Sequence, residues 1–560
     1  MNITINGQSK KCPFPATILD VAKETGINIP TLCYLKEVNE IGECNVCVAE
    51  ANGELVTACT YKVTDGMKIL TNTQRVRDAR RHALEKIMSA HRGNCLNCVR
   101  NLKCELQTLS AEFSIKDLAP AQDYQQPQVN CKTKSLTHDN SKCIKCRRCT
   151  AVCEQTQGIA ISDESINLPC NSNACVNCGQ CVIACPTAAL TETSDTAKVY
   201  AALADKSKYV VAITAPAVRV ALGECFGSDF GTNVEGKMVA ALRALGFAKV
   251  FDVPVGADFT IMEESAEFIN RLQTGENLPL FTSCCSSWVS YCEEFYPEFV
   301  QNLSSCKSPQ MMLGSLLKAY YAQKIGIAPK DLYVVSVMPC IAKKEEIRHP
   351  HSQAVSGIND IDVVITTREL AGMIKAHGIS FNNLPGEKFD PALGISTGAG
   401  YIFGTSGGVM EAALRTVVET VTGESLGRLQ LTELRGMQGI KEAEYNLGGR
   451  KVRVAVVSGL KNAGQLLDSI KSGAKKYDMV EVMASPGGCI GGGGQPIHSG
   501  LRDVSALRST ALYHGATDSR PVHKSHESPI VKELYANVIG EPGGETAHRW
   551  LHTTYRVKSI

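Results

Sequence analysis

The hydrophobic positions of this chain change their pattern near residue 206. Beyond it, short apolar runs such as KYVVAIT, LYVVSVMP and MVEVMAS alternate with stretches in which apolar residues recur at helical spacing. This alternation predicts a largely parallel β-sheet covered by helices. Before it, MNITINGQ alternates apolar and polar residues up to an Asn-Gly pair, which predicts a hairpin, and TILDVAKETG predicts a helix closed by Gly26.

The length and charge of the chain limit what it does. Its 560 residues are too many for one hydrophobic core, so we expect several domains. A formal net charge of +2 with 20% charged residues gives no support for nucleic-acid binding by bulk charge. The first ten residues lack the apolar segment of an export signal, and no run of about 18 apolar residues occurs. We therefore expect a cytoplasmic protein with no nucleic acid and no membrane among its partners.

The 25 cysteines change the picture most. Disulfides and metal sites are the two interpretations of so many cysteines. A disulfide-stabilised protein is small, secreted and evenly seeded with cysteine, whereas these cysteines form tight C-x-x-C groups in a long chain. The spacing therefore favours metal ligation.

The first cysteine group lies within residues 1–78. Four thiolates at this spacing suit a 2Fe–2S cluster or a zinc ion. The predicted hairpin and helix, with a C-x-x-C pair in a loop, resemble the ferredoxin-like 2Fe–2S module of large redox enzymes, which favours the cluster. Cys12 lies outside the set and is expected to be an inert thiol. The predicted ligands are Cys33, Cys44, Cys47 and Cys59.

The next group combines one histidine with three cysteines in the order H-x3-C-x2-C-x5-C. A zinc site and a 4Fe–4S cluster with one imidazole ligand both fit this spacing. The neighbouring segments look like iron–sulfur modules, which favours the cluster. The predicted ligands are His91, Cys95, Cys98 and Cys104.

The third group is the most specific. A C-x2-C-x2-C-x3-C run occurs twice, which is the pattern of bacterial two-cluster ferredoxins, where the fourth cysteine of each run ligates the other cluster. Cys131 and Cys170 are left over and are expected to be structural. One predicted cluster takes Cys143, Cys146, Cys149 and Cys185. The other takes Cys175, Cys178, Cys181 and Cys153.

Several one-electron centres in a row are typical of an electron-transfer chain that leads to a site where electrons are used. Three predicted strands of the second half are followed by cysteines, at Cys284–Cys285, Cys340 and Cys489. Ligands of open α/β sheets bind beyond the carboxyl ends of the strands, so these sulfurs are expected to converge on one metal centre. Neighbouring residues of an extended segment point in opposite directions, so only one of the adjacent pair readily ligates a given cluster, and the other is free for chemistry.

Three motifs at these cysteines resemble those of the iron-only (FeFe) hydrogenases of the monomeric clostridial type. TSCCSSW (282–288) is similar to TSCCPxW of that family, MPCIAKKEE (338–346) to MPCxxKxxE, and EVMASPGGCIGGGGQP (481–496) to ExMxCxxGCxxGGGQP. The final stretch from SHESPIVKEL to HRWLHTTY resembles the segment that is a separate small subunit in two-chain relatives. The resemblance covers essentially the whole chain.

The resemblance implies a multidomain protein of the α+β and α/β classes. Its parts would be a ferredoxin-like 2Fe–2S module at 1–78, a 4Fe–4S module with one histidine and three cysteines at 79–125, a two-cluster bacterial ferredoxin module at 126–205, an α/β hydrogenase catalytic domain at 206–515 and a small-subunit-like segment at 516–560. The implied cofactors are one 2Fe–2S cluster, three accessory 4Fe–4S clusters and the H-cluster. The H-cluster of that family is a 4Fe–4S cubane joined to a diiron unit with CO, cyanide and azadithiolate ligands.

The resemblance also implies roles for single residues. Cys489 would bridge the cubane to the diiron unit, Cys284 would be the free thiol that passes protons, and Lys343 would hydrogen-bond a cyanide. The four cubane positions would be Cys285, Cys340, Ser485 and Cys489. The apolar wall would be Met338, Met483, Phe403, Pro216 and Ala217. The proton route would continue through Glu264, Ser304 and Glu267. Without the resemblance, these last residues also fit a solvated acidic face and a capping serine.

The glycines around Cys489 raise a separate question of packing. They would let backbone approach the cofactor where a Cβ would collide. A phosphate-binding loop is the alternative, but no Lys-Ser/Thr pair follows the glycines. A nicotinamide site is not indicated either, because GTSGGVMEAALR (404–415) lacks the G-x-G-x-x-G spacing.

Two positions depart from the family motifs. Ser286 stands where the family has proline, which loosens the turn, and Ser485 stands where it has the fourth cubane cysteine. A serine oxygen is a harder and far less acidic ligand than a thiol. Three interpretations follow: an active hydrogenase whose cubane is held by Ser485 or water, a low-activity redox- or hydrogen-sensing hydrogenase-like protein, and an engineered Cys-to-Ser variant. An iron–sulfur assembly protein on the same scaffold is a fourth, but it would need no proton path.

The expected function is the reversible reduction of protons to molecular hydrogen, with electrons delivered through the accessory clusters to the H-cluster. Ferredoxin or flavodoxin would be the electron partner, and hydrogenase maturation proteins would assemble the H-cluster.

Overall fold

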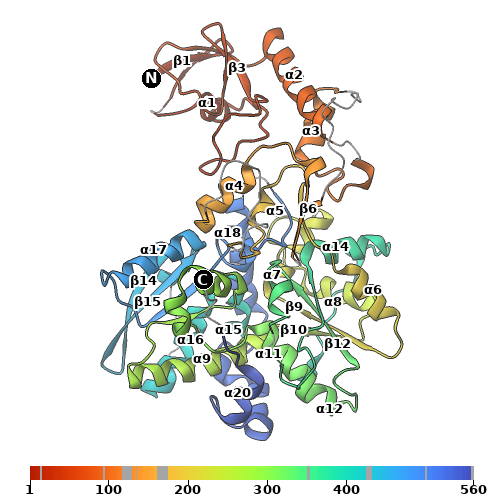
Figure 1. Cartoon of the computed structure of the whole chain (residues 1–560), viewed down its shortest axis with the longest axis vertical. Helices are drawn as coiled ribbons and strands as arrows, with labels where there is room; N and C mark the ends of the chain where they lie inside the picture. Colours follow the sequence, from red (N-terminus) through yellow and green to blue (C-terminus); the bar gives the residue numbers. More distant parts are fainter. Residues whose placement is uncertain are drawn as a thin grey trace. The chain divides into compact units, whose positions relative to one another are not determined.

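The computed structural model describes residues 1–12, 15–91, 95–115, 129–133, 135–159, 174–349, 353–423, 432–498 and 501–555. These residues form two compact units (Figure 1). The smaller unit holds the described residues of Met1–Gln155, Ile159–Asn173 and Gln180–Thr191. The larger unit holds those of Thr156–Gly158, Ala174–Gly179 and Glu192–Ile560.

The smaller unit begins with the predicted hairpin. Asn6 and Gly7 both have positive φ, 47° and 83°, as a two-residue turn between twisted strands requires. The predicted helix is α1 (Ile18–Glu24), which starts with a capping box between Thr17 and Asp20. The five-stranded sheet has the order β2-β1-β5-β3-β4. Its strands are β1 (Asn2–Ile5), β2 (Gln8–Lys11), β3 (Val48–Ala51), β4 (Glu54–Thr57) and β5 (Lys68–Leu70).

The rest of the smaller unit is built from short elements around cysteine-rich loops. Arg148 connects two of them, because its guanidinium makes a bidentate ion pair with Glu105 at 2.8 and 2.9 Å. The helices are α2 (Gln74–Ala90), α3 (Glu105–Glu112), α4 (Arg148–Val152) and α5 (Gln180–Ala184). A further sheet has the order β6-β7-β8, with β6 (Val129–Lys132), β7 (Leu136–Asp139) and β8 (Leu190–Glu192).

The larger unit contains two four-stranded sheets. They confirm the predicted alternation of parallel strands and helices, but the strands form two sheets rather than one. All strands of the first sheet, ordered β10-β9-β12-β13, are parallel. In the second, ordered β11-β16-β15-β14, only β14 is antiparallel. The first sheet comprises β9 (Tyr209–Thr214), β10 (Lys249–Asp252), β12 (Leu332–Met338) and β13 (Val363–Thr366). The second comprises β11 (Leu280–Thr282), β14 (Ile440–Leu447), β15 (Arg450–Ser458) and β16 (Met479–Met483).

Helices cover both sheets of the larger unit. α6, α8 and α14 pack on the first sheet, α16 and α17 pack on the second, and α9 contacts α11, α15 and α16 between them (Figure 1). The longer helices are α6 (Thr196–Ala204), α8 (Glu235–Ala244), α9 (Pro254–Thr274), α10 (Ser286–Phe295), α11 (Pro309–Leu316), α14 (Thr367–Ala376), α16 (Gly408–Thr422), α17 (Leu460–Lys471) and α18 (Leu501–Asp518). The short ones are α7 (Pro216–Arg219), α12 (Ala322–Lys324), α13 (Lys343–Glu346), α15 (Gly398–Tyr401), α19 (Pro529–Leu534) and α20 (Glu545–Leu551).

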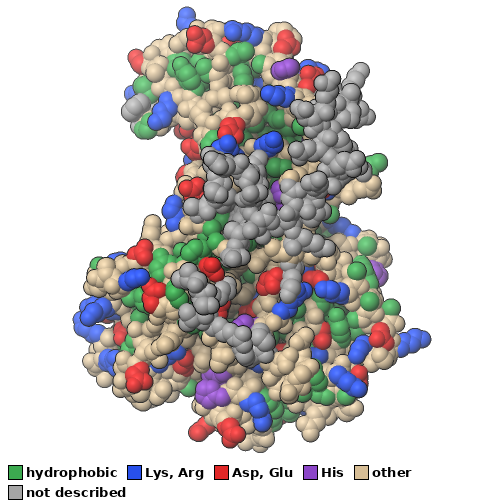
Figure 2. Space-filling model, viewed as in Figure 1, with side chains coloured by type: hydrophobic (Ala, Val, Ile, Leu, Met, Phe, Trp, Pro, Cys, Tyr) green, Lys and Arg blue, Asp and Glu red, His purple; other side chains and the backbone are tan. Residues whose placement is uncertain are grey.

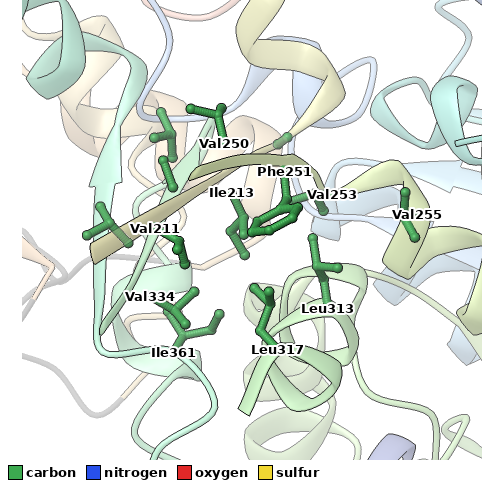
Figure 3. Close-up of a cluster of buried hydrophobic side chains, with 14 of the residues drawn as sticks. Val211, Ile213, Val250, Phe251, Val253, Val255, Leu313, Leu317, Val334 and Ile361 are labelled. Carbon is green, nitrogen blue, oxygen red and sulfur yellow. The ribbon is translucent and has the colours of Figure 1, made fainter. Parts of the chain in front are cut away.

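The core of the first sheet lies between its strands and α11. Figure 3 shows the ring of Phe251 among valine and isoleucine side chains of the strands, with Leu313 and Leu317 beneath it. Each such side chain stabilises the fold by about 1.5–3 kcal/mol when fully buried. This core holds the strands in place. The cysteine motif at 338–346 begins at the carboxyl end of one of them, β12.

The face of the larger unit that Figure 2 shows has no concentration of one charge among the described residues. Basic and acidic side chains are interspersed over the visible face of the larger unit (Figure 2). Among the described residues, no helix is long and apolar enough to cross a membrane.

The contact between α9 and α11 depends on one glycine. A Cβ at Gly256 would lie 2.2 Å from the carbonyl oxygen of Pro309 and 3.1 Å from Leu313 N. Both obstacles are backbone atoms, so the helices would have to separate.

We therefore expect Gly256→Ala to lower the free energy of unfolding by about 1–3 kcal/mol, as overpacking does. Gly372→Ala is the matched control, because its Cβ would meet no atom within 4 Å on α14. That change should be neutral or stabilise by up to about 1 kcal/mol. Denaturant unfolding of both variants measures the difference, and equal stabilities would contradict the close contact.

Candidate functional site

Three of the predicted cysteines line one cavity in the larger unit. Cys284 follows β11, Cys340 follows β12 and Cys489 follows β16, each just beyond a strand carboxyl end. All three lie in the wall of one cavity. The strands belong to two sheets, so the cavity lies where the two sheets present their carboxyl ends to one another.

The adjacent cysteines of the first motif occupy different surroundings. Cys284 Sγ lies 3.9 Å from Cys489 Sγ and 3.9 Å from Met483 Sδ. Cys285 precedes the first turn of α10, and among the described residues it is not part of the cavity wall. The side chains of the two cysteines therefore point in different directions, as those of neighbouring residues in an extended segment do.

The thiols of Cys285, Cys340 and Cys489 are difficult to ionise. Burial raises the pKa of Cys340 to about 12 and also raises the pKa of Cys285. The hydrogen bond with Cys284 and burial together raise the pKa of Cys489. A buried thiolate needs a compensating cation, so this donor set suits a bound metal cluster, which turns buried thiols into ligands.

Lys343 supplies the cationic group of the cavity wall. Its Nζ lies 2.7 and 2.8 Å from the two carboxylate oxygens of Glu346. Burial opposes the charge, but Glu346 and the neighbouring thiols raise the pKa of Lys343 above its ordinary value. Glu346 also accepts hydrogen bonds from Ser308 and Gln310. The ammonium is thereby held charged and fixed at the edge of the cavity.

The predicted apolar residues are all buried, but they are not equivalent. Pro216, Met338 and Phe403 line the cavity. Met483 contacts the Cys284 sulfur, and Ala217 lies behind Gly404, 3.4 Å from the position of a Cβ there. The wall therefore has three directly lining residues and two that support it.

The glycine-rich loop is tightly packed against protein. A Cβ at Gly488 would lie 2.7 Å from Ser406 N, and one at Gly492 would lie 2.5 Å from the Pro339 carbonyl oxygen. A Cβ at Gly491 would lie 2.3 Å from the Pro486 carbonyl oxygen. The sequence led us to expect that the glycines make room for the cofactor. The structure adds a second reason, because neighbouring backbone alone already forbids side chains at these three positions, and the approach to the cofactor stays a prediction.

One contact of this loop involves a predicted cluster ligand. A Cβ at Gly493 would lie 2.4 Å from the carbonyl oxygen of Cys178, and one at Gly179 would lie 2.6 Å from Ile341. The segment Ala174–Gly179 belongs to the larger unit. Backbone of the second ferredoxin run therefore touches the loop that carries Cys489.

Ser485 lies in the same loop and is 7% exposed. Its carbonyl oxygen accepts a hydrogen bond from Gly488 N at 3.0 Å, which closes a turn. The preceding residue, Ala484, accepts a hydrogen bond from the Gln157 amide at 3.1 Å. The backbone of this corner is therefore fixed whatever the side chain at 485.

The three predicted proton-route residues also lie together. Glu264 of α9 is 2% exposed and accepts a hydrogen bond from Thr282 Oγ1 at 2.6 Å. Ser304 Oγ donates to Glu267 at 3.0 Å and also hydrogen-bonds Glu264. Burial raises the pKa of Glu264 to about 7, although Thr282 oppositely favours its ionised form. The solvated acidic face is therefore the wrong interpretation for Glu264.

The cysteines of the first module are gathered in the smaller unit. Cys47 Sγ and Cys59 Sγ lie 3.3 Å apart, and Cys33 and Cys44 hydrogen-bond one another. Cys12 lies apart, with its sulfur 3.7 Å from the Met1 carbonyl oxygen.

The group of one histidine and three cysteines lines a single hollow. Its four predicted ligands, His91, Cys95, Cys98 and Cys104, lie in the wall. His91 Nδ1 lies 3.1 Å from the Lys142 carbonyl oxygen, and burial lowers the pKa of the imidazole. A neutral ring held through Nδ1 presents Nε2 as the ligand atom.

The first ferredoxin set is also together in the smaller unit. Cys143, Cys146 and Cys185 repel negative charge on Cys149, and together with burial they raise its pKa. The second set is divided between the units, with Cys153 and Cys181 in one and Cys175 and Cys178 in the other, so its convergence stays a prediction. The side chain of Cys131 and all of Cys170 lie outside the described residues.

The roles of three residues at the site were not predicted from the sequence. Thr282 donates to Glu264, Glu346 pairs with Lys343, and Arg271 pairs with Glu267 at 2.6 Å. The helical spacing Lys343–Glu346 and Glu267–Arg271 is the signal that was available. Nothing in the local pattern distinguished Thr282 from an ordinary strand residue.

Comparison with known proteins agrees with this arrangement. Five family models match successive parts of the chain. They are the 2Fe-2S iron-sulfur cluster binding domain at residues 1–74, the NADH-ubiquinone oxidoreductase-G iron-sulfur binding region at 80–118, the 4Fe-4S dicluster domain at 135–200, the C-terminal domain of the iron only hydrogenase large subunit at 208–493 and the iron hydrogenase small subunit at 502–558.

Whole proteins match over the full length. The NADP-reducing hydrogenase subunit HndD of Solidesulfovibrio fructosivorans is 45% identical, covering 99% of this chain and 98% of that protein. Iron hydrogenase 1 of Clostridium pasteurianum is 39% identical, covering 99% of each. The structure of apo [FeFe]-hydrogenase HydA1 from Chlamydomonas reinhardtii matches with a TM-score of 0.60 and 42% identity, over 66% of this chain and 100% of that one.

The buried thiols, the charged lysine and the matched families agree on one type of protein. The chain belongs to the iron-only (FeFe) hydrogenases, oxidoreductases whose cofactors are the 2Fe–2S and 4Fe–4S accessory clusters and the H-cluster.

Proposed function

We propose that this hydrogenase reversibly reduces protons to molecular hydrogen with electrons from ferredoxin or flavodoxin. The observation that carries the proposal is the shared cavity, in which Cys284, Cys340, Cys489 and Lys343 meet at the ends of three strands. A thiol for protons, thiols for iron and a fixed cation are the groups that this reaction needs in one place.

The assignment of residues follows from their positions. Cys285, Cys340, Cys489 and the residue at 485 would hold the cubane, with Cys489 shared with the diiron unit. The H-cluster supplies the two-electron chemistry between protons and hydrogen. The protein supplies binding, orientation and a dry surrounding. Pro216, Met338 and Phe403 exclude water from the cavity, and the Lys343 ammonium offers a point donor to an anionic ligand.

Protons would travel along residues of α9 and its neighbours. Cys284 would exchange a proton with the reacting centre, and Glu264, Ser304 and Glu267 would continue the route outward. Each group can lose and regain a proton, and Ser304 already hydrogen-bonds both carboxylates. Thr282 orients Glu264 by donating to one of its oxygens.

Electrons would enter through the accessory clusters. The contact of the Cys178–Gly179 backbone with Gly493 supports a final transfer from the second ferredoxin cluster to the cubane, because Gly493 lies four residues from Cys489. Tight backbone contact leaves no space for solvent between the two segments.

A direct assay tests the proposal. Matured protein should evolve hydrogen from reduced ferredoxin, and Cys284→Ala should lower the rate by about 10²-fold or more while the electron paramagnetic resonance (EPR) signals of the clusters persist. Cys292→Ala is the matched control, because Cys292 is a buried cysteine of α10 outside the cavity wall. Full activity of Cys284→Ala would contradict the assigned role.

A second electron partner is favoured by one relative. The 45% identical protein is a subunit of an NADP-reducing hydrogenase. This chain lacks a dinucleotide fingerprint at 404–415, so nicotinamide chemistry here would need a further subunit. The same assay with NADPH and the isolated chain should give no hydrogen.

Ser485 decides between the active enzyme and a low-activity sensor or an engineered form. A thiolate is softer and forms more readily than a serine alkoxide, so Ser485→Cys should raise the amount of cubane retained per chain and the rate of hydrogen evolution. Iron content, EPR redox titration and turnover measure the change. Ser485→Ala is the companion variant, since it loses cubane only if the serine oxygen ligates. Near-background turnover of a fully assembled parent would support the sensor. An unchanged rate in Ser485→Cys would show that the serine does not limit the activity.

The raised pKa of Glu264 predicts a titration near neutral pH. The carboxyl should remain protonated in the folded protein up to about pH 7, whereas it ionises near 4.5 when exposed. Folding stability should therefore fall as pH rises from 4.5 to about 7, because the unfolded chain then binds fewer protons.

Infrared spectroscopy should show a protonated carboxyl band that disappears near pH 7 and is absent in Glu264→Gln, which should also lose about 10²-fold or more in turnover. Glu276→Gln, an exposed position just beyond α9, should keep both the band and the rate. A band that disappears near pH 4.5 would show that burial does not hold the proton.

A further inference from the structure

The outer end of the proposed proton route needs a group that exchanges protons with solvent. Glu267 bonds Arg271 at 2.6 Å, and that side chain also donates to the carbonyl oxygens of Asn277, Asn302 and Leu303. A guanidinium does not release its protons in proteins, so Arg271 cannot be the relay. The other groups bonded to Glu267 are the hydroxyl of Ser304, the thiol of Cys306 and the backbone N–H of Ser305. Burial raises the pKa of Cys306 well above its ordinary value, so this thiol does not readily release its proton. Ser305 is therefore the neighbour of Glu267 through which a proton could arrive from outside.

Ser305 leads to a histidine of the C-terminal segment. His552 Nδ1 lies 2.8 Å from Ser305 Oγ, and His552 Nε2 lies 2.9 Å from Glu263 Oε2. The backbone fixes this pairing, because Thr553 N donates to Ser305 O and Lys307 N donates to Leu551 O, each at 2.8 Å. The segment 551–553 therefore runs antiparallel to 305–307, with Cys306 and His552 as bridge partners.

Both ring nitrogens of His552 are bonded to side chains of the protein. Its partner Glu263 is fully buried and also accepts hydrogen bonds from Tyr535 OH and from Gly543 N, the latter at 2.8 Å. The titratable groups that face this pair are Tyr535 from η14 (Tyr535–Ile539) and His548 from α20, with Glu267 and Cys306 beyond Ser305.

His548 connects the pair to the surface. Its ring lies 4.2 Å from the ring of His552, centroid to centroid, and it is exposed. His552 itself keeps 7% of its side chain exposed. An imidazole is the side chain whose ordinary pKa suits proton exchange near neutral pH.

We propose that His552 is the outer proton relay of this hydrogenase, so that the C-terminal segment supplies a working part of the proton route. The inference rests on the proposed route through Glu264 and Glu267. In the direction of hydrogen evolution, the His552 imidazolium gives its Nδ1 proton to the Ser305 hydroxyl oxygen. The hydroxyl proton passes to the Glu267 carboxylate after a turn about the Cα–Cβ bond, because the N–H of the same serine already bonds Glu267. The neutral imidazole then turns about its Cβ–Cγ bond, which frees Nδ1 from Ser305, and Nδ1 regains a proton from solvent before the ring turns back.

The experiment compares two substitutions in the full, matured chain. His552→Phe fills the space without ring nitrogens and should lower hydrogen evolution by roughly tenfold with a larger solvent deuterium isotope effect. The loss should be smaller than the ~10² expected inside the route, because Glu267 is 14% exposed and exchanges slowly by itself. His552→Ala opens a cavity, and added imidazole should restore its rate in proportion to concentration. His377→Phe, at the residue that follows α14 and outside this network, should keep the parent rate.

The outcomes separate the two proposals. Iron content and cluster EPR signals first establish that each variant is folded and loaded. A parent-like rate in His552→Phe would overturn the relay, and so would a slow His552→Ala that imidazole does not restore, since that pattern indicates positioning alone. Glu264→Gln is measured in parallel. If it too evolves hydrogen at the parent rate, the proposed route itself fails. If it is inactive while His552→Phe is normal, only the outer relay fails.

Discussion

The close approach of backbone to backbone around Gly487–Gly494 is the constraint on which the site depends. Four separate segments meet there: the turn after β12 at Pro339, the turn at Ser406, the end of the second ferredoxin run at Cys178, and the loop itself. None of these approaches leaves room for a Cβ, so the loop has one arrangement rather than several. That single arrangement places Cys489 against Cys284 and fixes the corner at Ser485. A cluster held at Cys285, Cys340, Ser485 and Cys489 would need such a frame, because these four positions come from three separate parts of the chain.

Burial is the main influence on several groups within this frame. It raises the pKa of Cys285, Cys340 and Glu264, so their surroundings disfavour negative charge. The hydrogen bond with Cys284 raises the pKa of Cys489, and Glu346 maintains the positive charge of Lys343. The same low polarity makes the substitution at 485 consequential. A serine hydroxyl gives up its proton far less readily than a thiol, and a dry corner makes that loss harder still.

Much of this arrangement could be predicted from the sequence, because the information was local. Periodicity gave the strands β9, β12 and β16, the Asn6-Gly7 turn gave the first hairpin, and motif spacing gave the cysteine groups. The division of the strands into two sheets was not predictable, since β11 and β16 are adjacent in space but about 200 residues apart in sequence. The contacts of the glycines with Pro339, Ser406 and Cys178 were not predictable for the same reason, because no local pattern connects these residues with the loop.

Three glutamates of helix α9 have different partners in the fold. Glu263, Glu264 and Glu267 lie within five residues, and as a sequence they suggest a single acidic face. In the fold, Glu264 turns toward β11 and Thr282, Glu267 bonds Ser304 and Arg271, and Glu263 bonds Tyr535 and His552 of the C-terminal segment. Like charges so close together repel, and burial together with the charge of Glu267 raises the pKa of Glu264 to about 7. The acidic groups become a connected path only because segments distant in the sequence supply the hydroxyls and the imidazole between them. The C-terminal segment, which in the sequence follows the whole catalytic domain, therefore bonds α9 directly, beside the proposed proton route.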